Sequence, residues 1–116
     1  MKVHTFSEDN KTWDVKDLWE AAKKEKMILI SCRYLKRYID ADIWDIWKIR
    51  SLKEFSFHMK LVMESDLRYP IILTPEKFIA DGYHRLLKAL YLNKKVVKCK
   101  VLKKMPMTIG MKNRKK

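Results

Sequence analysis

The chain contains only two glycines, and the first of them, Gly82, lies between two segments of opposite pattern. Residues 77–80 (KFIA) have the pattern of a β-strand, whereas residues 83–92 carry apolar side chains at the spacing of an α-helix. Glycine accepts backbone angles that other residues avoid, so it suits a sharp turn from strand to helix. The N-terminal end of a helix presents N–H groups and is made positive by the helix dipole. The sequence therefore predicts a strand–turn–helix unit whose helix end could bind an anion.

The side chains around Gly82 support two interpretations. His84, Arg85 and Lys88 would add donors to the backbone N–H groups, and together they would form a phosphate cradle. Because a carboxylate repels a phosphate, Asp81 fits this cradle only if it caps the helix or holds a divalent cation. In the alternative interpretation, Gly82 only permits a tight turn and the charged side chains lie on the helix surface. The pattern lacks the Lys-Ser/Thr ending of a P-loop and the glycines of a dinucleotide fingerprint, so spacing alone favours the alternative.

Hydrophobic periodicity predicts the other strands and helices. Strands are expected at residues 2–6, 27–31, 70–74, 77–80 and 97–101, and helices at residues 12–24, 36–48, 52–63 and 83–92. Ser51 and Glu54 match a capping box at the start of the third helix, and Asn93 suits a left-handed residue after the last helix. The predicted fold class is α+β, with a small mixed sheet and about four helices in one domain at residues 1–102. A basic tail, residues 103–116, is expected to be flexible.

Large apolar side chains form two sets. One face of the third helix carries Leu52, Phe55, Met59, Val62 and Met63. The chain also has four tryptophans, which are Trp13, Trp19, Trp44 and Trp47. Tryptophans among basic residues can stack on nucleic-acid bases, but helical spacing favours positions in the core. Asp42 and Asp45 would form a solvated face around Trp44.

The net charge of +13 is concentrated in the second half of the chain. Residues 51–116 carry 16 basic and 5 acidic side chains, and the tail KKMPMTIGMKNRKK has no acidic residue. Such a field attracts polyanions and speeds their encounter, although a solvated basic surface without a specific partner would look the same. The chain has no apolar run of the roughly 18 residues that span a bilayer. The N-terminus lacks the apolar core of a signal peptide, and Cys32 and Cys99 do not form a disulfide framework. We therefore expect a cytoplasmic protein with two reduced thiols.

The run PIIL…FIADGYHRLLKAL…KKVVKCKVL resembles the C-terminal half of the ParB/sulfiredoxin-like superfamily, over about residues 57–102. That half consists of a hairpin, a Gly-containing turn with a His-Arg pair, a helix with small residues and a closing strand. The resemblance is greatest to small stand-alone members with an Asp-Gly-x-His-Arg motif. The matching residues here are His58, Ser65-Asp66-Leu67, Tyr69 to Leu73, Asp81-Gly82, His84-Arg85 and Lys88-Ala89-Leu90.

The resemblance implies that the turn binds nucleotide phosphates, of ATP or CTP, through backbone N–H groups and the His and Arg side chains. It assigns this role to Gly82, the backbone of Tyr83, His84 and Arg85. Sulfiredoxins carry a cysteine where this chain has Tyr83, so sulfinic-acid repair is excluded. Partition-type members add a helix-turn-helix DNA reader, for which 116 residues leave no room.

The resemblance is also the reason to expect that His58, Asp66 and Asp81 converge on the turn. Asp81 could then hold Mg²⁺, and the set Asp81, His84, Arg85, His58 and Asp66 could supply acid–base chemistry. The alternative for His58 is a structural residue at the edge of its helix. The resulting hypothesis is a nucleotide-binding domain that acts on or near nucleic acid, by Mg²⁺-dependent phosphoryl transfer or by nucleotide or phosphodiester hydrolysis if it is catalytic. The rivals are a non-catalytic module that binds DNA, RNA or an acidic protein, and a small-metabolite kinase.

Overall fold

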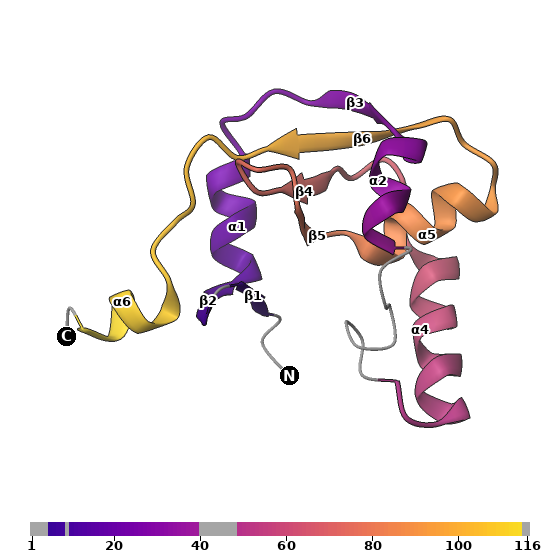
Figure 1. The fold of residues 1–116 in the computed structure, drawn as a ribbon, viewed down its shortest axis with the longest axis horizontal. Helices are drawn as coiled ribbons and strands as arrows, with labels where there is room; N and C mark the ends of the chain where they lie inside the picture. Colours follow the sequence, from indigo (N-terminus) through magenta and orange to yellow (C-terminus); the bar gives the residue numbers. More distant parts are fainter. Residues whose placement is uncertain (1–4, 9, 40–48, 115–116) are drawn as a thin grey trace.

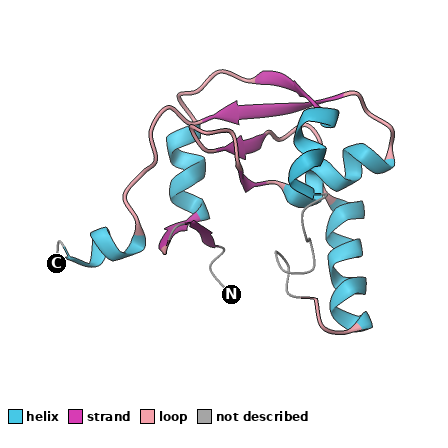
Figure 2. Cartoon of the chain, in the orientation of Figure 1, coloured by secondary structure: helices cyan, strands magenta, loops and turns pink. Residues whose placement is uncertain are grey.

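The computed structural model describes residues 5–8, 10–39 and 49–114, and these ranges contain two β-sheets and five helices (Figure 1, Figure 2). The larger sheet has the strand order β3, β6, β4, β5. These strands are β3 (Ile28–Ser31), β6 (Val96–Val101), β4 (Ile71–Leu73) and β5 (Ile79–Asp81). Since β6 pairs in parallel with β4 and antiparallel with β3, the sheet is mixed. The predicted α+β class is confirmed.

Strand β4 lies at the centre of the domain and is buried on both faces. Its first and third side chains pack with α2 (Cys32–Ile39) and α5 (Tyr83–Tyr91), whereas Ile72 points to the other face and packs with α1 (Val15–Ala22). This alternation follows from the two-residue repeat of a strand. The uninterrupted apolar run of β4 therefore serves two core clusters, one on each side of the sheet.

Several predicted elements around β4 are confirmed. The expected hairpin of residues 70–74 and 77–80 corresponds to β4 and β5, which pair antiparallel. The alternating pattern at 97–101 corresponds to β6, with Val97 and Cys99 buried. Asn93 follows α5 with a φ of 57°, the left-handed conformation expected there.

The N-terminal third differs from the prediction. Residues 12–14, expected at the start of a helix, instead belong to β2 (Lys11–Asp14), which pairs with β1 (Thr5–Glu8) in a separate two-stranded sheet. Helix α1 begins only after Asp14, because that carboxylate caps the helix by accepting the N–H of Lys16 at 3.4 Å.

The second predicted helix also has different bounds. Instead of starting at residue 36, α2 starts at Cys32, where the hydroxyl of Ser31 accepts the N–H of Arg33 at 3.1 Å. The second half of the predicted helix lies outside the described residues, and so do Asp42, Trp44, Asp45 and Trp47. Of the other tryptophans, Trp13 is buried and Trp19 packs against the same core cluster, as predicted.

Helix α4 (Leu52–Glu64) confirms the predicted capping box in a modified form. The Ser51 hydroxyl accepts the N–H of Glu54 at 3.1 Å, and the Glu54 carboxylate accepts the N–H of Arg50 at 2.9 Å, one residue further back than in the standard motif. Of the predicted apolar face of this helix, only Val62 is buried, and the other members are exposed: Leu52, Phe55, Met59 and Met63.

The segment that follows β6 packs on the domain, although we expected a flexible tail from residue 103. Trp13 Nε1 donates to the Pro106 carbonyl at 2.9 Å, and the buried Glu25 carboxylate accepts the N–H of Lys103 at 3.2 Å. A short helix, α6 (Ile109–Arg114), then follows Thr108, whose hydroxyl accepts a first-turn N–H. The indole and the carboxylate thus anchor this segment. Among the described residues, no helix is long and apolar enough to cross a membrane.

Candidate functional site

The turn between β5 and α5 is built around Gly82, which has a φ of 121° and precedes the first residue of α5. A Cβ atom at this position would lie 3.0 Å from Ile71 Cγ1 and 3.1 Å from an Arg85 guanidinium nitrogen. The chain itself therefore fills the space beside Gly82. The glycine is required by its backbone conformation and by close packing of β4, rather than by the approach of a ligand from that side.

Two histidines meet at the start of α5. His58 Nδ1 on α4 lies 2.9 Å from His84 Nε2 on α5, and the two rings are nearly parallel, with centroids 5.2 Å apart. In such a hydrogen bond one nitrogen carries the proton and the other accepts it, so at least one ring is neutral at that position. Burial lowers the pKa of His58 from its usual value of 6.5, against an opposing effect of Glu54 one turn earlier. The predicted convergence of His58 on the turn is therefore present.

The carboxylate of Asp81 is bound from two sides. Its Oδ2 accepts the indole N–H of Trp19 at 2.8 Å and a guanidinium N–H of Arg85 at 3.1 Å. The Arg85 side chain is only 18% exposed, and its guanidinium carbon lies 5.4 Å from the centroid of the Trp19 ring. Its Nε is buried without a hydrogen-bond partner. Arg85 thus neutralises Asp81 inside the protein, and Gly82, not Asp81, is the N-cap of α5.

Lys88 and Ser65 connect α5 to the end of α4. Lys88 Nζ donates to the carbonyl oxygens of Met63 at 2.9 Å and of Ser65 at 2.6 Å. These carbonyls lie at the C-terminal end of α4, where the last C=O groups have no intrahelical N–H donor, so the ammonium satisfies them. The Ser65 hydroxyl donates to the Val62 carbonyl at 2.7 Å. Lys88, predicted to bind phosphate, therefore holds α4 against α5.

Asp66 pairs with Arg68. The guanidinium of Arg68 contacts both carboxylate oxygens, the shortest distance being 2.7 Å. These hydrogen bonds lower the pKa of Asp66 to about 2, so the group stays ionised at neutral pH. It is thus unsuited to act as a general acid or base near pH 7.

Metal and thiol chemistry have little support in the described residues. In the ranges 5–8, 10–39 and 49–114, no group of three or more His, Cys, Asp or Glu side chains could hold a metal ion. Cys32 and Cys99 are both buried and unbridged. Burial raises the pKa of both thiols, that of Cys99 to about 12, so neither forms a reactive thiolate near neutral pH.

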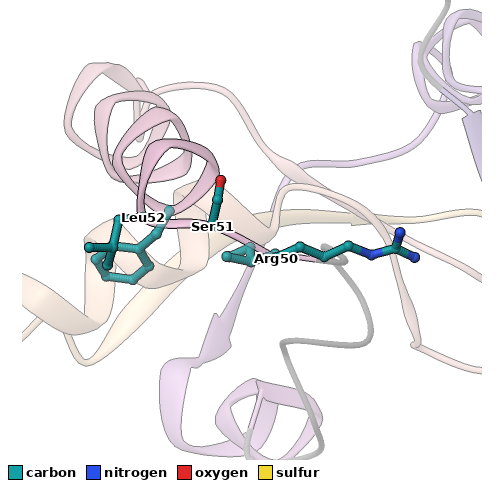
Figure 3. A pocket seen from close by; sticks show the side chains of 5 residues that line it. Arg50, Ser51 and Leu52 are labelled. Carbon is teal, nitrogen blue, oxygen red and sulfur yellow. The ribbon is translucent and has the colours of Figure 1, made fainter.

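Two surface hollows lie elsewhere. One, of about 420 Å³, lies at the start of α4 and is lined by Ile49, Arg50, Ser51, Leu52 and Phe55. Figure 3 shows the Arg50 and Leu52 side chains pointing to opposite sides of Ser51. The other, of about 670 Å³, lies between β2 and α6 and is lined by Asn10, Lys11, Thr12, Thr108, Ile109, Gly110 and Met111. Neither hollow is lined by the Gly82 turn.

No family model, curated protein or solved structure matches this chain. The site must therefore be interpreted from its own geometry. Sequence reasoning paired His58 with the turn but missed the role of Trp19, which reaches Asp81 across 62 residues of sequence. No local pattern marks such a contact, because an indole donor and a carboxylate acceptor at that separation follow no repeat.

Substituting Gly82→Ala should lower the free energy of unfolding by about 1–3 kcal/mol, because the positive φ and the contact with Ile71 both resist a Cβ. Urea unfolding monitored by circular dichroism measures the change. Gly110→Ala is the matched control, since its nearest neighbour would lie 3.9 Å away and alanine favours a helix. Equal stability of the two variants would show that the Gly82 turn is not strained.

The stability of the protein should fall as the pH decreases from about 7 to about 5, in part through His58. The pKa of His58 is lower in the folded protein than in the unfolded chain. Below about pH 6.5 the unfolded state therefore binds more protons and is stabilised relative to the folded state. The contribution is fully present above that pH. In His58→Gln the pH dependence should be shallower in urea unfolding measured at a series of pH values. An unchanged slope would exclude this role.

Proposed function

We propose that this protein binds the phosphate group of a nucleotide, ATP or CTP, at the first turn of α5 and acts on or near nucleic acid. The observation that carries the proposal is the meeting of His58 and His84 at the N-terminal end of that helix, 2.9 Å apart. The resemblance of residues 57–102 to ParB/sulfiredoxin-like domains supports the same turn and the same fold assignment.

The electrostatics of the turn are suited to an anion. The helix end contributes partial positive charge through its N–H groups, and Arg85 pairs with the carboxylate of Asp81, which would otherwise oppose a phosphate. A dianionic phosphate near the histidine pair would raise the proton affinity of the imidazoles, since a nearby negative charge favours the imidazolium. The pair could therefore bind the phosphate and donate a proton to it.

This arrangement gives the residues of the turn different roles from those predicted from the sequence. His58 and His84 become the side chains proposed to contact the phosphate, with the backbone of Gly82 and Tyr83. Arg85 acts indirectly, through Asp81, and Lys88 acts by fixing α4. A Mg²⁺ ion would be bound mainly by the nucleotide phosphates, as is usual for this cation, with Asp81 as the nearest protein carboxylate. If the protein is catalytic, phosphoryl transfer or hydrolysis with His58 or His84 as the general acid or base fits these groups.

A thermal-shift panel tests the proposal. ATP or CTP, with and without Mg²⁺, should raise the melting temperature of the wild type, because a ligand that binds only the folded state stabilises it. His84→Gln should lose most of that shift. Lys53→Gln, which removes an exposed positive charge on α4, should keep it and so controls for general electrostatics. Arg85→Ala is less informative, because it leaves Asp81 without its counter-ion. No shift with any nucleotide would contradict the proposal.

A second function, binding of a polyanion by the basic surface alone, is favoured by the charge distribution. Residues 51–116 hold 16 basic and 5 acidic side chains, and the last five residues include four basic ones. This function requires no site at Gly82, so the two functions predict different responses to mutation.

Fluorescence anisotropy with a double-stranded oligonucleotide separates them. Replacing Lys112, Arg114, Lys115 and Lys116 by glutamine should weaken DNA binding and reduce the slope of log K against log salt by up to about 0.9 for each lost phosphate contact. These substitutions are preferable to deletion of residues 103–116, since Lys103 and Pro106 contact the core. If the four substitutions left DNA binding unchanged, or if His84→Gln abolished it, binding by the basic surface alone would be contradicted.

A further inference from the structure

Strand β3 forms one end of the larger sheet and, within the described residues, has one edge without a strand partner. It lies at the end of the four-stranded sheet and pairs with β6 along one side only, through Ile28 to Ser31 (Figure 1). The strand at the opposite end, β5, is different, since Ile79 and Ala80 are buried. An edge strand presents backbone N–H and C=O groups that another chain can pair with. Within the described residues, β3 is therefore the accessible edge of the sheet.

The side chains along this edge are apolar and exposed. Leu29 is 64% exposed, Met27 46% and Ile28 39%, and Val96 on the neighbouring strand is 47% exposed. Helix α1 packs mainly against β4 and β5, at the other end of the sheet. Natural edge strands are commonly protected by a charged residue or a proline, but Ile28–Ser31 contains neither. The edge thus combines unpaired backbone with apolar contact surface.

The charges around the edge all have one sign. Exposed basic residues precede β3, follow it and flank it on β6, and they are Lys24, Lys26, Arg33, Lys94, Lys95 and Lys98. The register places Lys98 directly beside Leu29. The one acidic residue in these segments, Glu25, is buried and accepts the N–H of Lys103. A second copy of this chain would therefore bring two basic rims together, and like charges oppose that pairing.

We propose that β3 is a docking site for an extended acidic segment of a partner protein, which adds to the sheet as a further strand. The backbone edge would supply main-chain hydrogen bonds, Leu29 would contact the apolar residues that alternate along one face of the added strand, and the basic rim would select acidic neighbours. Nucleic acid matches the rim but cannot continue a β-ladder. The proposal is independent of the Gly82 turn and stands or falls separately from nucleotide binding.

A labelled peptide of about ten residues with alternating Val and Glu tests the proposal, since this length matches a typical strand. Fluorescence anisotropy should show binding to the wild type and to His84→Gln. Leu29→Ser should weaken binding by about tenfold or more, as expected for loss of a central apolar contact. Leu52→Ser is the matched control, because Leu52 is also an exposed leucine but lies on α4.

Four further measurements address the mode of binding. The same peptide with Lys in place of Glu should not bind. The double substitution Lys94→Glu and Lys98→Glu should weaken the binding of the acidic peptide. Two further peptides carry N-methyl groups on the odd-numbered or on the even-numbered amides. Only one of them should lose binding, because alternate N–H groups point to opposite edges of a strand and only one edge faces β3. Amide hydrogen exchange of residues 28–31 should slow when the peptide is bound.

Several outcomes would overturn the proposal. These are equal binding by Leu29→Ser and the wild type, or equal binding of both N-methylated peptides. A Leu29-dependent dimer of the chain alone in analytical ultracentrifugation would assign the edge to a second copy. Binding of single-stranded DNA that is also lost in Leu29→Ser would assign it to nucleic acid.

Discussion

The burial of β4 on both faces is the constraint on which the rest of the structure depends. Three consecutive apolar residues, Ile71 to Leu73, each have less than 2% of their surface exposed and serve two separate core clusters. Strand β6 pairs beside β4 in parallel, and Leu102 continues the ladder by donating its N–H to the Leu73 carbonyl. The same strand fixes the candidate site, because Ile71 occupies the space beside Gly82 and so determines where α5 begins.

The charged groups around α5 are used mainly to assemble the domain. Arg85 joins α5 to Asp81, Asp81 joins the turn to Trp19 of α1, and Lys88 joins α5 to the end of α4. Buried or half-buried charges of this kind need partners, since an unpaired charge in the interior is costly. The histidine pair is different because an imidazole can be neutral, so a half-buried histidine need not leave a permanent charge in the protein. This is why the pair, and not the Arg or the Lys, carries the proposed function.

The sequence was sufficient to predict the parts of the fold that depend on local pattern. Alternation and turn chemistry identified β4, β5 and β6, and the Ser51–Glu54 pattern identified the start of α4. Long-range contacts decided the parts that were predicted incorrectly. Lys11–Asp14 has a helical apolar spacing but forms β2, since pairing with β1 and burial of Trp13 outweigh its local preference. The segment after residue 102 is basic, yet Met105 packs against the core cluster of Trp13, and Trp13 and Glu25 anchor the segment through backbone groups that no side-chain pattern records.

The hydrogen bond between Trp19 and Asp81 has a consequence for how the molecule folds. It closes a loop of 62 residues, and the Arg85 ion pair shares its acceptor atom. The entropy of closing such a loop must be overcome before the contact contributes, so contacts of this span generally form late. The strand–turn–helix unit of residues 79–91 contains the Asp81–Arg85 ion pair within itself, but Asp81 accepts the Trp19 indole N–H only when α1 has docked. The candidate site is therefore fully formed only after the N-terminal and C-terminal halves of the chain have packed together.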